Sequence, residues 1–231
     1  MLSNTKTTIG TIAHMPLGIR GAEEFTWSWS QMIEFNADYL CAPNERVFYT
    51  RAAVTYHSFA RDMLAKQMRG DWILMLDTDH RFEPDLAHRM LRIFEMNQLD
   101  VLTGLYVYKG EPHPPVLYTR NPDGMLSILG AWDVPEGDGP YLVPIASAGG
   151  GCLMIRRSVF QRIEKELKES PFGPRGSFSE DHAFFDRCHA LKIPAYCCPT
   201  IESYHLGTQS FGLQDFHVEE QVLGPRIEVA R

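Results

Sequence analysis

The chain has 231 residues, of which 44% are hydrophobic and 22% are charged, so it is long enough to bury a substantial core as a single domain. Its 22 lysines and arginines stand against 29 acidic residues, and the net charge of -7 excludes a general electrostatic attraction to nucleic acid or an anionic membrane. The sequence shows no apolar run long enough to cross a bilayer, no signal-peptide core and no CxxC pair among its five cysteines. We therefore expect one domain over residues 1–231, in a reducing, cytoplasmic compartment.

Strands and helices are predicted to alternate along most of the chain. Short apolar or β-branched runs bounded by turn residues indicate strands, and apolar residues at intervals of three or four indicate helices. The predicted strands are 8–13, 38–42, 72–76, 101–107, 195–198 and 202–205, and the predicted helices are 23–35, 52–68, 84–97, 157–168 and 179–191. This alternation is typical of an α/β domain.

Two segments depart from this pattern. Residues 110–144 are rich in glycine and proline and contain a hairpin-like turn at Asn121–Gly124. We interpret this segment as a variable insertion rather than a second domain. The tail, 207–231, has little periodicity.

The most informative stretch is the buried strand that ends in two carboxylates. Five apolar residues, Trp72–Leu76, precede Asp77 and Asp79. Side chains at i and i+2 share one face of a strand, so both carboxylates can approach one divalent cation. The same argument points His80 to the opposite face, outside the metal group. An acidic turn that caps the next helix is the alternative interpretation.

A second acidic pair and a late histidine follow. Glu180 and Asp181 begin a predicted helix after Ser179, where a serine cap and helix-dipole stabilisation would account for them. A carboxylate fixed at a helix start is also rigidly aimed, so Asp181 could serve as a base. A histidine such as His205 is more often a satisfied core or surface residue than a ligand.

Several common nucleotide and hydrolase motifs are absent. The three glycines at 149–151 permit close backbone approach to a ligand, but no Gly-Lys-Ser/Thr follows them, so they are not a phosphate-binding P-loop. The sequence also has no GxGxxG fingerprint, no GxSxG elbow and no HExxH zinc motif.

Taken in order, the motifs over residues 50–207 resemble the GT-A glycosyltransferases, most closely family two. The resemblance implies a GT-A, Rossmann-like mixed sheet flanked by helices. The matching pieces are Arg61-Asp62 ("aRN"), Gly70–Asp79 ("gd-hydrophobic-DxD"), Asp100–Gly104 ("dvvsG"), Ala148–Arg157 ("GG-hydrophobic-rR"), Glu180–Arg187 ("EDxxFxxR") and His205.

The resemblance also implies roles for individual residues. Asp77 and Asp79 would hold the nucleotide and a Mn²⁺ or Mg²⁺ ion, and His205 would complete the metal site. Asp181 would be the catalytic base, with Glu180 supporting it. The remaining expected donor contacts are Arg61, Gly149, Gly150, and His14 and Pro16 of the first loop, where the family usually has "PxYN".

The implied activity is metal-dependent transfer of a sugar from a nucleoside-diphosphate sugar to an acceptor hydroxyl, with inversion if Asp181 is the base. A UDP-sugar is the expected donor, although Tyr39–Pro43 lacks the acidic pair with which the family reads the base. The acceptor is left open among a glycan, a protein, a small molecule and modified DNA. Segment 110–144, with Trp132 and Tyr141, is expected to face it, and 207–231 to act as a lid.

Two alternatives remain at this stage. A haloacid-dehalogenase-like phosphatase also ends a buried strand in Asp-X-Asp, with the first Asp attacking phosphate. Arg81, however, stands where that motif requires Thr or Val. A non-catalytic sugar-nucleotide-binding module is the other alternative, although Asp77, Asp79, Asp181 and His205 are all present.

Overall fold

The computed structural model describes residues 7–12, 19–39, 48–52, 56–129, 141–207 and 210–212. Its helices are α1 (Ile19–Tyr39), α2 (His57–Gln67), α3 (Leu86–Met96), α4 (Arg157–Arg162), which continues as a π-helical turn (Ile163–Leu167), and α5 (Glu180–Ala190). Its strands are β1 (Thr7–Ile12), β2 (Phe48–Ala52), β3 (Trp72–Asp77), β4 (His80–Phe82), β5 (Val101–Leu105), β6 (Leu117–Arg120), β7 (Leu126–Ile128), β8 (Val143–Ile145), β9 (Ser147–Ala148), β10 (Cys152–Arg156), β11 (Ala195–Leu206) and β12 (Ser210–Phe211).

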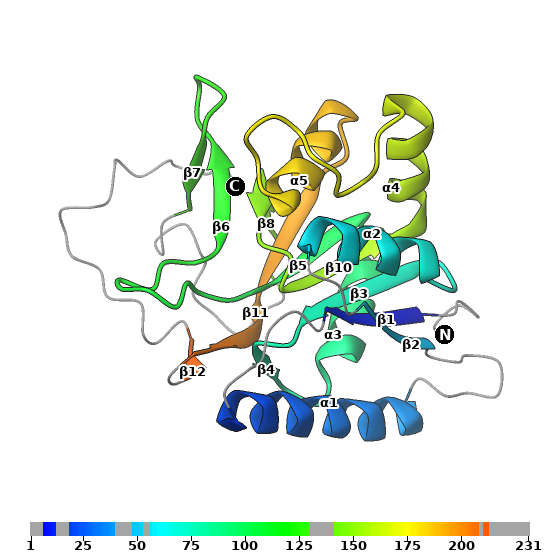
Figure 1. Ribbon diagram of the computed structural model, residues 1–231, viewed down its shortest axis with the longest axis vertical. Coiled ribbons are helices and arrows are strands. Elements are labelled where there is room, and N and C mark those ends of the chain that lie inside the picture. The colour runs from blue at the N-terminus through cyan, green and yellow to red at the C-terminus, as the bar shows by residue number, and fades with distance from the viewer. Residues whose placement is uncertain are drawn as a thin grey trace.

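A mixed sheet forms the centre of the molecule, in the order β12-β11-β5-β10-β3-β1-β2 (Figure 1). β1 pairs in parallel with both β2 and β3, and β5 pairs in parallel with β11. β10 runs antiparallel between β3 and β5. Parallel neighbours need long crossovers, and helices supply them, as in the connection from β1 through α1 to β2. The predicted mixed sheet flanked by helices is therefore confirmed.

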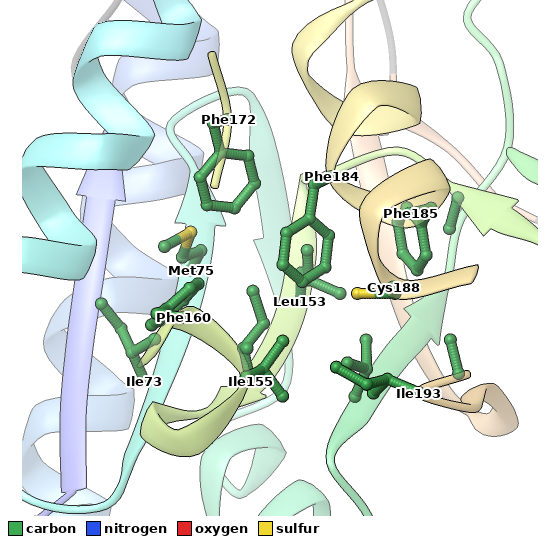
Figure 2. Close-up of a cluster of buried hydrophobic side chains, with 14 of the residues drawn as sticks. Ile73, Met75, Leu153, Ile155, Phe160, Phe172, Phe184, Phe185, Cys188 and Ile193 are labelled. Carbon is green, nitrogen blue, oxygen red and sulfur yellow. The ribbon is translucent and has the colours of Figure 1, made fainter. Parts of the chain in front are cut away.

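Helices cover both faces of the sheet, which explains the uninterrupted apolar run of β3. Ile73 and Met75 of β3 point to the face covered by α2, α4 and α5. Figure 2 shows them on the same side as Phe160 and Phe184 of those helices. Alternate residues of β3, such as Leu74, point to the other face, where α1 and α3 pack.

Part of segment 110–144 forms a small second sheet, in the order β7-β6-β9. β6 and β7 make the predicted hairpin, and Gly124 in its turn has a φ of 81°, a conformation that favours glycine. β6 also pairs with β9, joining Leu117 to Ala148. This pairing attaches the hairpin to the polypeptide just before the 149–151 glycines. That the segment is a variable insertion stays a prediction.

Three predicted boundaries were wrong. α1 continues to Tyr39, so the strand predicted at 38–42 does not begin there, and the fully buried Met32 and Asn36 show the packing that holds its last turns. The helix predicted from Ala52 starts at His57 because Ala52 ends β2. The two short strands predicted after 195 are one strand, β11, whose register shifts between Cys198 and Glu202, around a proline that cannot donate to the ladder.

In the described part of the chain, none of the helices combines the length and the apolar character that a membrane span requires.

Candidate active site

The candidate site lies where β3 ends and the chain turns into β4. β3 stops at Asp77, Thr78 and Asp79 form a turn, and β4 begins at His80. β4 pairs with β11 in a register that places His80 opposite His205, and the two rings stack with their centroids 4.8 Å apart. Asp79, His80 and His205 offer ligand atoms that all lie within 4.8 Å of one another.

The cluster corrects the predicted direction of the His80 side chain. The prediction extended strand alternation through Asp79, but the turn at Thr78 and Asp79 ends that alternation and directs His80 back toward the site. Asp77 lies outside the three-residue cluster, and both of its carboxylate oxygens contact Arg61.

Hydrogen bonds orient the two imidazoles. His205 Nδ1 lies 2.9 Å from the carbonyl oxygen of Val107, which can only accept, so Nδ1 carries the proton. Nε2 of His205 then faces Oδ2 of Asp79 at 3.3 Å. Nδ1 of His80 forms a hydrogen bond with the hydroxyl of Ser203 at 3.0 Å. Nε2 of His80 lies 4.0 Å from Oδ1 of Asp79. Each ring therefore turns one nitrogen toward the same carboxylate.

The charges of this cluster suit a cation. Burial, and after it the charge of His205, lower the pKa of His80 to about 4, so the His80 ring is neutral at pH 7. Burial alone would raise the pKa of Asp79, but His205, His80 and Lys109 outweigh burial and hold that pKa far below its usual range. Lys109 contributes an ion pair, with Nζ 2.7 Å from Oδ2 of Asp79. An ionised carboxylate between imidazole nitrogens is a typical set of metal ligands.

Arg61 of α2 lies behind the cluster and is surrounded by acids. Its side chain is only 2% exposed, and Nη2 lies 3.1 Å from Oδ2 of Asp77. Nε lies 3.1 Å from Oδ1 of Asp181, as an ion pair without hydrogen-bond alignment, and 3.7 Å from Glu180. Nη1 donates to the carbonyl of Gly150. Burial would lower the pKa of Arg61, but these carboxylates raise it above its usual value, so the guanidinium stays charged.

Asp181 occupies the first turn of α5. Its pKa is raised to about 7, because burial, Glu180 and Asp77 raise it by more than Arg61 and the backbone of Gly150 lower it. Its side chain remains 19% exposed, so the carboxyl group can still reach a ligand. Ser179 stands at the predicted N-cap position but makes no side-chain capping bond, and Glu180 and Asp181 are the acids of the first turn.

The three glycines at 149–151 make room for side chains of the site. A Cβ atom at Gly149 would lie 2.0 Å from the hydroxyl of Tyr106, and one at Gly150 would lie 2.3 Å from Cζ of Arg61. A Cβ at Gly151 would lie 2.4 Å from Nε2 of His80. Each missing side chain thus leaves space for one functional group of the protein itself. The glycines had predicted close approach of a ligand to the backbone, whereas these three contacts within the protein were not predicted.

A pocket of about 230 Å³ joins these groups. Its lining residues come from the ends of β3, β5, β11 and α5, and from the small sheet: Asp77, His80, Tyr106, Tyr108, Val116, Tyr118, Gly149, Gly150, Ser179, Asp181, His182 and His205. Asp181 therefore shares one pocket with two members of the histidine-carboxylate cluster. His182 is fixed there by a 2.7 Å hydrogen bond between Nδ1 and Ser147 Oγ, and Tyr118 packs edge-on against its ring.

The family model described as Glycosyl transferase family 2 matches residues 34–164, more than half of the chain. The chain belongs to glycosyl transferase family 2. The match spans Arg61, the strand that ends in Asp77 and the 149–151 glycines, and it stops before Asp181 and His205. No curated protein sequence matches the chain.

Solved structures share the fold of the chain. The crystal structure of A197 from STIV aligns over 98% of this chain and 100% of its own, with a TM-score of 0.54 and 14% identity. The crystal structure of GalNAc-T7 with UDP, GalNAc and Mn²⁺ aligns over 98% of this chain with a TM-score of 0.58 and 12% identity. The chain spans 46% of the GalNAc-T7 chain. At these identities the likeness shows the fold, and it confirms the predicted GT-A architecture.

The structure brings together most of the site residues expected of this family. Asp77, Asp79, Arg61, Gly149, Gly150, Glu180, Asp181 and His205 all lie in or beside the pocket. Val116 and Tyr118 show that segment 110–144 reaches it, whereas Tyr141 is exposed and does not line it. His14, Pro16, Trp132 and most of 207–231 lie outside the described residues.

His80 was excluded from the predicted site, and several other residues that lie there were not predicted. His182 directly follows Asp181, so its position beside a motif could have drawn attention to it. Tyr106 and Lys109 follow the predicted strand at 101 and carry no motif. Only the folded chain shows that Lys109 reaches Asp79.

Proposed function

We propose that the protein transfers a sugar from a nucleoside-diphosphate sugar, with UDP as the first nucleotide to test, to an acceptor hydroxyl, with inversion and with a divalent metal ion. The observation that carries this proposal is a single pocket that is lined by Asp181 and by the His80 and His205 side chains. A base and a candidate cation site thus face the same space, as transfer from a diphosphate requires.

The residues present fit a divalent cation. Nδ1 of His205 is committed to Val107, so Nε2 is the ring nitrogen that faces a carboxylate oxygen of Asp79, at 3.3 Å. An imidazole nitrogen and a carboxylate oxygen at one place are ligands that a divalent cation binds. Asp79, His205 and His80 would hold the ion, and Asp77 lines the same pocket within reach of the nucleotide. When bound, the ion would neutralise charge on the departing diphosphate.

The choice of metal follows from the ligand types. Mg²⁺ is bound almost entirely through oxygen atoms, whereas this cluster offers two imidazole nitrogens beside one carboxylate. We therefore place Mn²⁺ ahead of Mg²⁺. The Mn²⁺ in the GalNAc-T7 structure is consistent with this order.

Asp181 is proposed as the base. The acceptor oxygen attacks the anomeric carbon, its proton passes to the Asp181 carboxylate, and the bond to the diphosphate oxygen breaks with its electron pair on the leaving group. A base works best when its pKa is near the working pH, and the raised pKa of Asp181, about 7, meets that condition. Glu180 supports Asp181 by sharing the contact with Arg61. Attack opposite the leaving group would invert the anomeric carbon.

The acceptor is proposed to be an uncharged, hydroxyl-bearing molecule such as a sugar. Tyr108, Tyr118 and His182 line the pocket beside Asp181, and aromatic faces suit the C–H face of a sugar ring. The pocket also carries two carboxylates, which would repel an anionic acceptor. This argues against modified DNA, as does the net charge of -7.

The phosphatase alternative loses support. The family match and the GT-A fold favour a transferase. Asp77, which would have to attack phosphate, lies with both oxygens 3.1 to 3.2 Å from Arg61, and so is held as an ion-pair partner. The other alternative, a non-catalytic sugar-nucleotide-binding module, would bind a donor without turning it over, whereas a transferase would turn it over.

The first test is thermal unfolding with nucleoside diphosphates and sugar nucleotides, with and without Mn²⁺. Ligands that bind only the folded protein raise the melting temperature. We expect a Mn²⁺-dependent increase with one nucleotide, lost in Asp79→Ala and kept in Asp123→Ala, which removes an exposed acid from the β6–β7 turn. If no nucleotide shifts the melting temperature of the unmodified protein, the proposal is wrong.

A further inference from the structure

Lys109 pairs with the carboxylate that is proposed to hold the metal. It follows β5, in a loop closed by the bridge between Val107 and Pro115. Its Nζ lies 2.7 Å from Oδ2 of Asp79, the same oxygen that faces Nε2 of His205 at 3.3 Å. In the protein without ligand, an ammonium group therefore neutralises the carboxylate at the position where a metal ion would bind.

We propose that Lys109 exchanges partners during donor binding, and this inference rests on the proposed function. Without metal, Lys109 neutralises Asp79. When a divalent cation takes the Asp79 carboxylate, the ammonium is displaced and binds the diphosphate that arrives with the cation. Lys109 is thus a positioning residue that adds a second positive charge to the leaving group and also competes with the metal.

Two properties separate Lys109 from the other cation of the site. Arg61 is 2% exposed and fixed to Asp77, Asp181 and the Gly150 carbonyl, so it cannot follow a ligand. Lys109 is 39% exposed and carries its charge on a flexible four-carbon stem.

Electrostatics gives the direction of the exchange. An ammonium and a divalent cation on one carboxylate repel each other strongly at contact distance. A diphosphate beside the metal offers the ammonium several anionic oxygens instead, and a lysine binds phosphate well as a point charge. When the metal displaces Lys109 from Asp79, the neighbouring diphosphate therefore becomes its new partner.

The test uses Lys109→Met, which keeps the length of the side chain and removes the charge. The matched control is Lys66→Met, which removes the same charge from an exposed position on α2. Mn²⁺ binding without nucleotide is followed by the electron paramagnetic resonance signal of free Mn²⁺. We expect Lys109→Met to bind Mn²⁺ about tenfold more tightly than the unmodified protein, and Lys66→Met to bind it unchanged.

The second measurement is the affinity for inorganic pyrophosphate at saturating Mn²⁺, which does not depend on the identity of the nucleobase. Here Lys109→Met should bind about tenfold more weakly, and Lys109→Arg should bind nearly as well as the unmodified protein. Melting temperatures of all variants confirm that they fold.

The outcomes distinguish this inference from the proposed function. If Mn²⁺ binds the unmodified protein and neither affinity changes in Lys109→Met, the partner exchange is wrong and the metal-dependent transferase stands. If Mn²⁺ binds neither the unmodified protein nor Lys109→Met, both are overturned. Opposite changes in the two affinities support the exchange.

Discussion

Two buried arginines of this chain, Arg61 and Arg187, lie among acids, but the balance of charge around them is opposite. Arg61 is surrounded by three carboxylates, those of Asp77, Glu180 and Asp181. Arg187 contacts Glu169 at 2.8 Å, and it donates hydrogen bonds to the carbonyls of Pro171 and Pro174 in the loop that follows Glu169. Acids are in excess at the first arginine.

At Arg187 the cations are in excess. Arg175 binds both Glu169 and Asp186, and Arg120 of β6 also binds Asp186. Three arginines thus share two carboxylates. Arg175 and Arg187 hold the pKa of Glu169 below its usual value, and Arg175 and Arg120 outweigh burial to lower that of Asp186.

The difference separates a structural cluster from a reactive one. Where arginines are in excess, every carboxylate stays ionised and paired, and the cluster fastens a loop and a hairpin to α5. Where carboxylates are in excess, one of them, Asp181, has a pKa raised to about 7 and lines a pocket. Perturbed groups of this kind are concentrated at functional sites.

The largest expected effect comes from neutralising one acid in each cluster. Asp181→Asn should lower the transfer rate by about 10² to 10⁴-fold, the usual contribution of a general base, with little loss of stability. Asp186→Asn should leave the rate near that of the unmodified protein and lower the melting temperature. Steady-state kinetics with a donor found by thermal shift, together with melting curves, checks both. If Asp181→Asn and Asp186→Asn lose the same amount of transfer rate, the distinction between a reactive and a structural cluster is wrong.

Removing each arginine tests the same division through stability. Arg61→Met leaves three partly buried carboxylates without their cation, and we expect it to cost about 3 to 5 kcal/mol. Arg187→Met should cost about 1 to 3 kcal/mol, because Glu169 is 36% exposed and keeps Arg175. Urea unfolding gives both free energies. If Arg187→Met lowers the free energy of unfolding by more than Arg61→Met does, the view that Arg61 compensates an excess of acids is wrong.

The smallest expected effect on stability is its dependence on pH. Asp181 has a folded pKa raised above its unfolded value, so its ionised form opposes folding, and stability should increase as pH falls from about 7 toward 4. Glu169 and Asp186 have lowered folded pKa values, so the stability they contribute is present above about pH 4 and lost below it.

The transfer rate should fall about tenfold per pH unit below 7. A rate that is constant from pH 7 to 5 would remove Asp181 as the base.

The sequence was sufficient for features that depend on neighbouring residues. The uninterrupted apolar run at Trp72–Leu76 predicted β3, because a strand covered on both faces must be apolar on both sides. The glycine in the turn at Asn121–Gly124 predicted the β6–β7 hairpin, since that position has a positive φ. The order of short motifs predicted the family, which the family match later showed.

Contacts between distant residues were decided by the tertiary structure. The turn at Thr78 and the register of β4 against β11 bring His80 beside His205, 125 positions later, and strand alternation alone pointed His80 away. Arg61 meets Asp181 because α2 and α5 cover the same face of the sheet, and Lys109 meets Asp79 through a loop with no motif. Local patterns determine which elements form, whereas the pairing register and packing of those elements determine which charges meet, and those charges set the chemistry of the pocket.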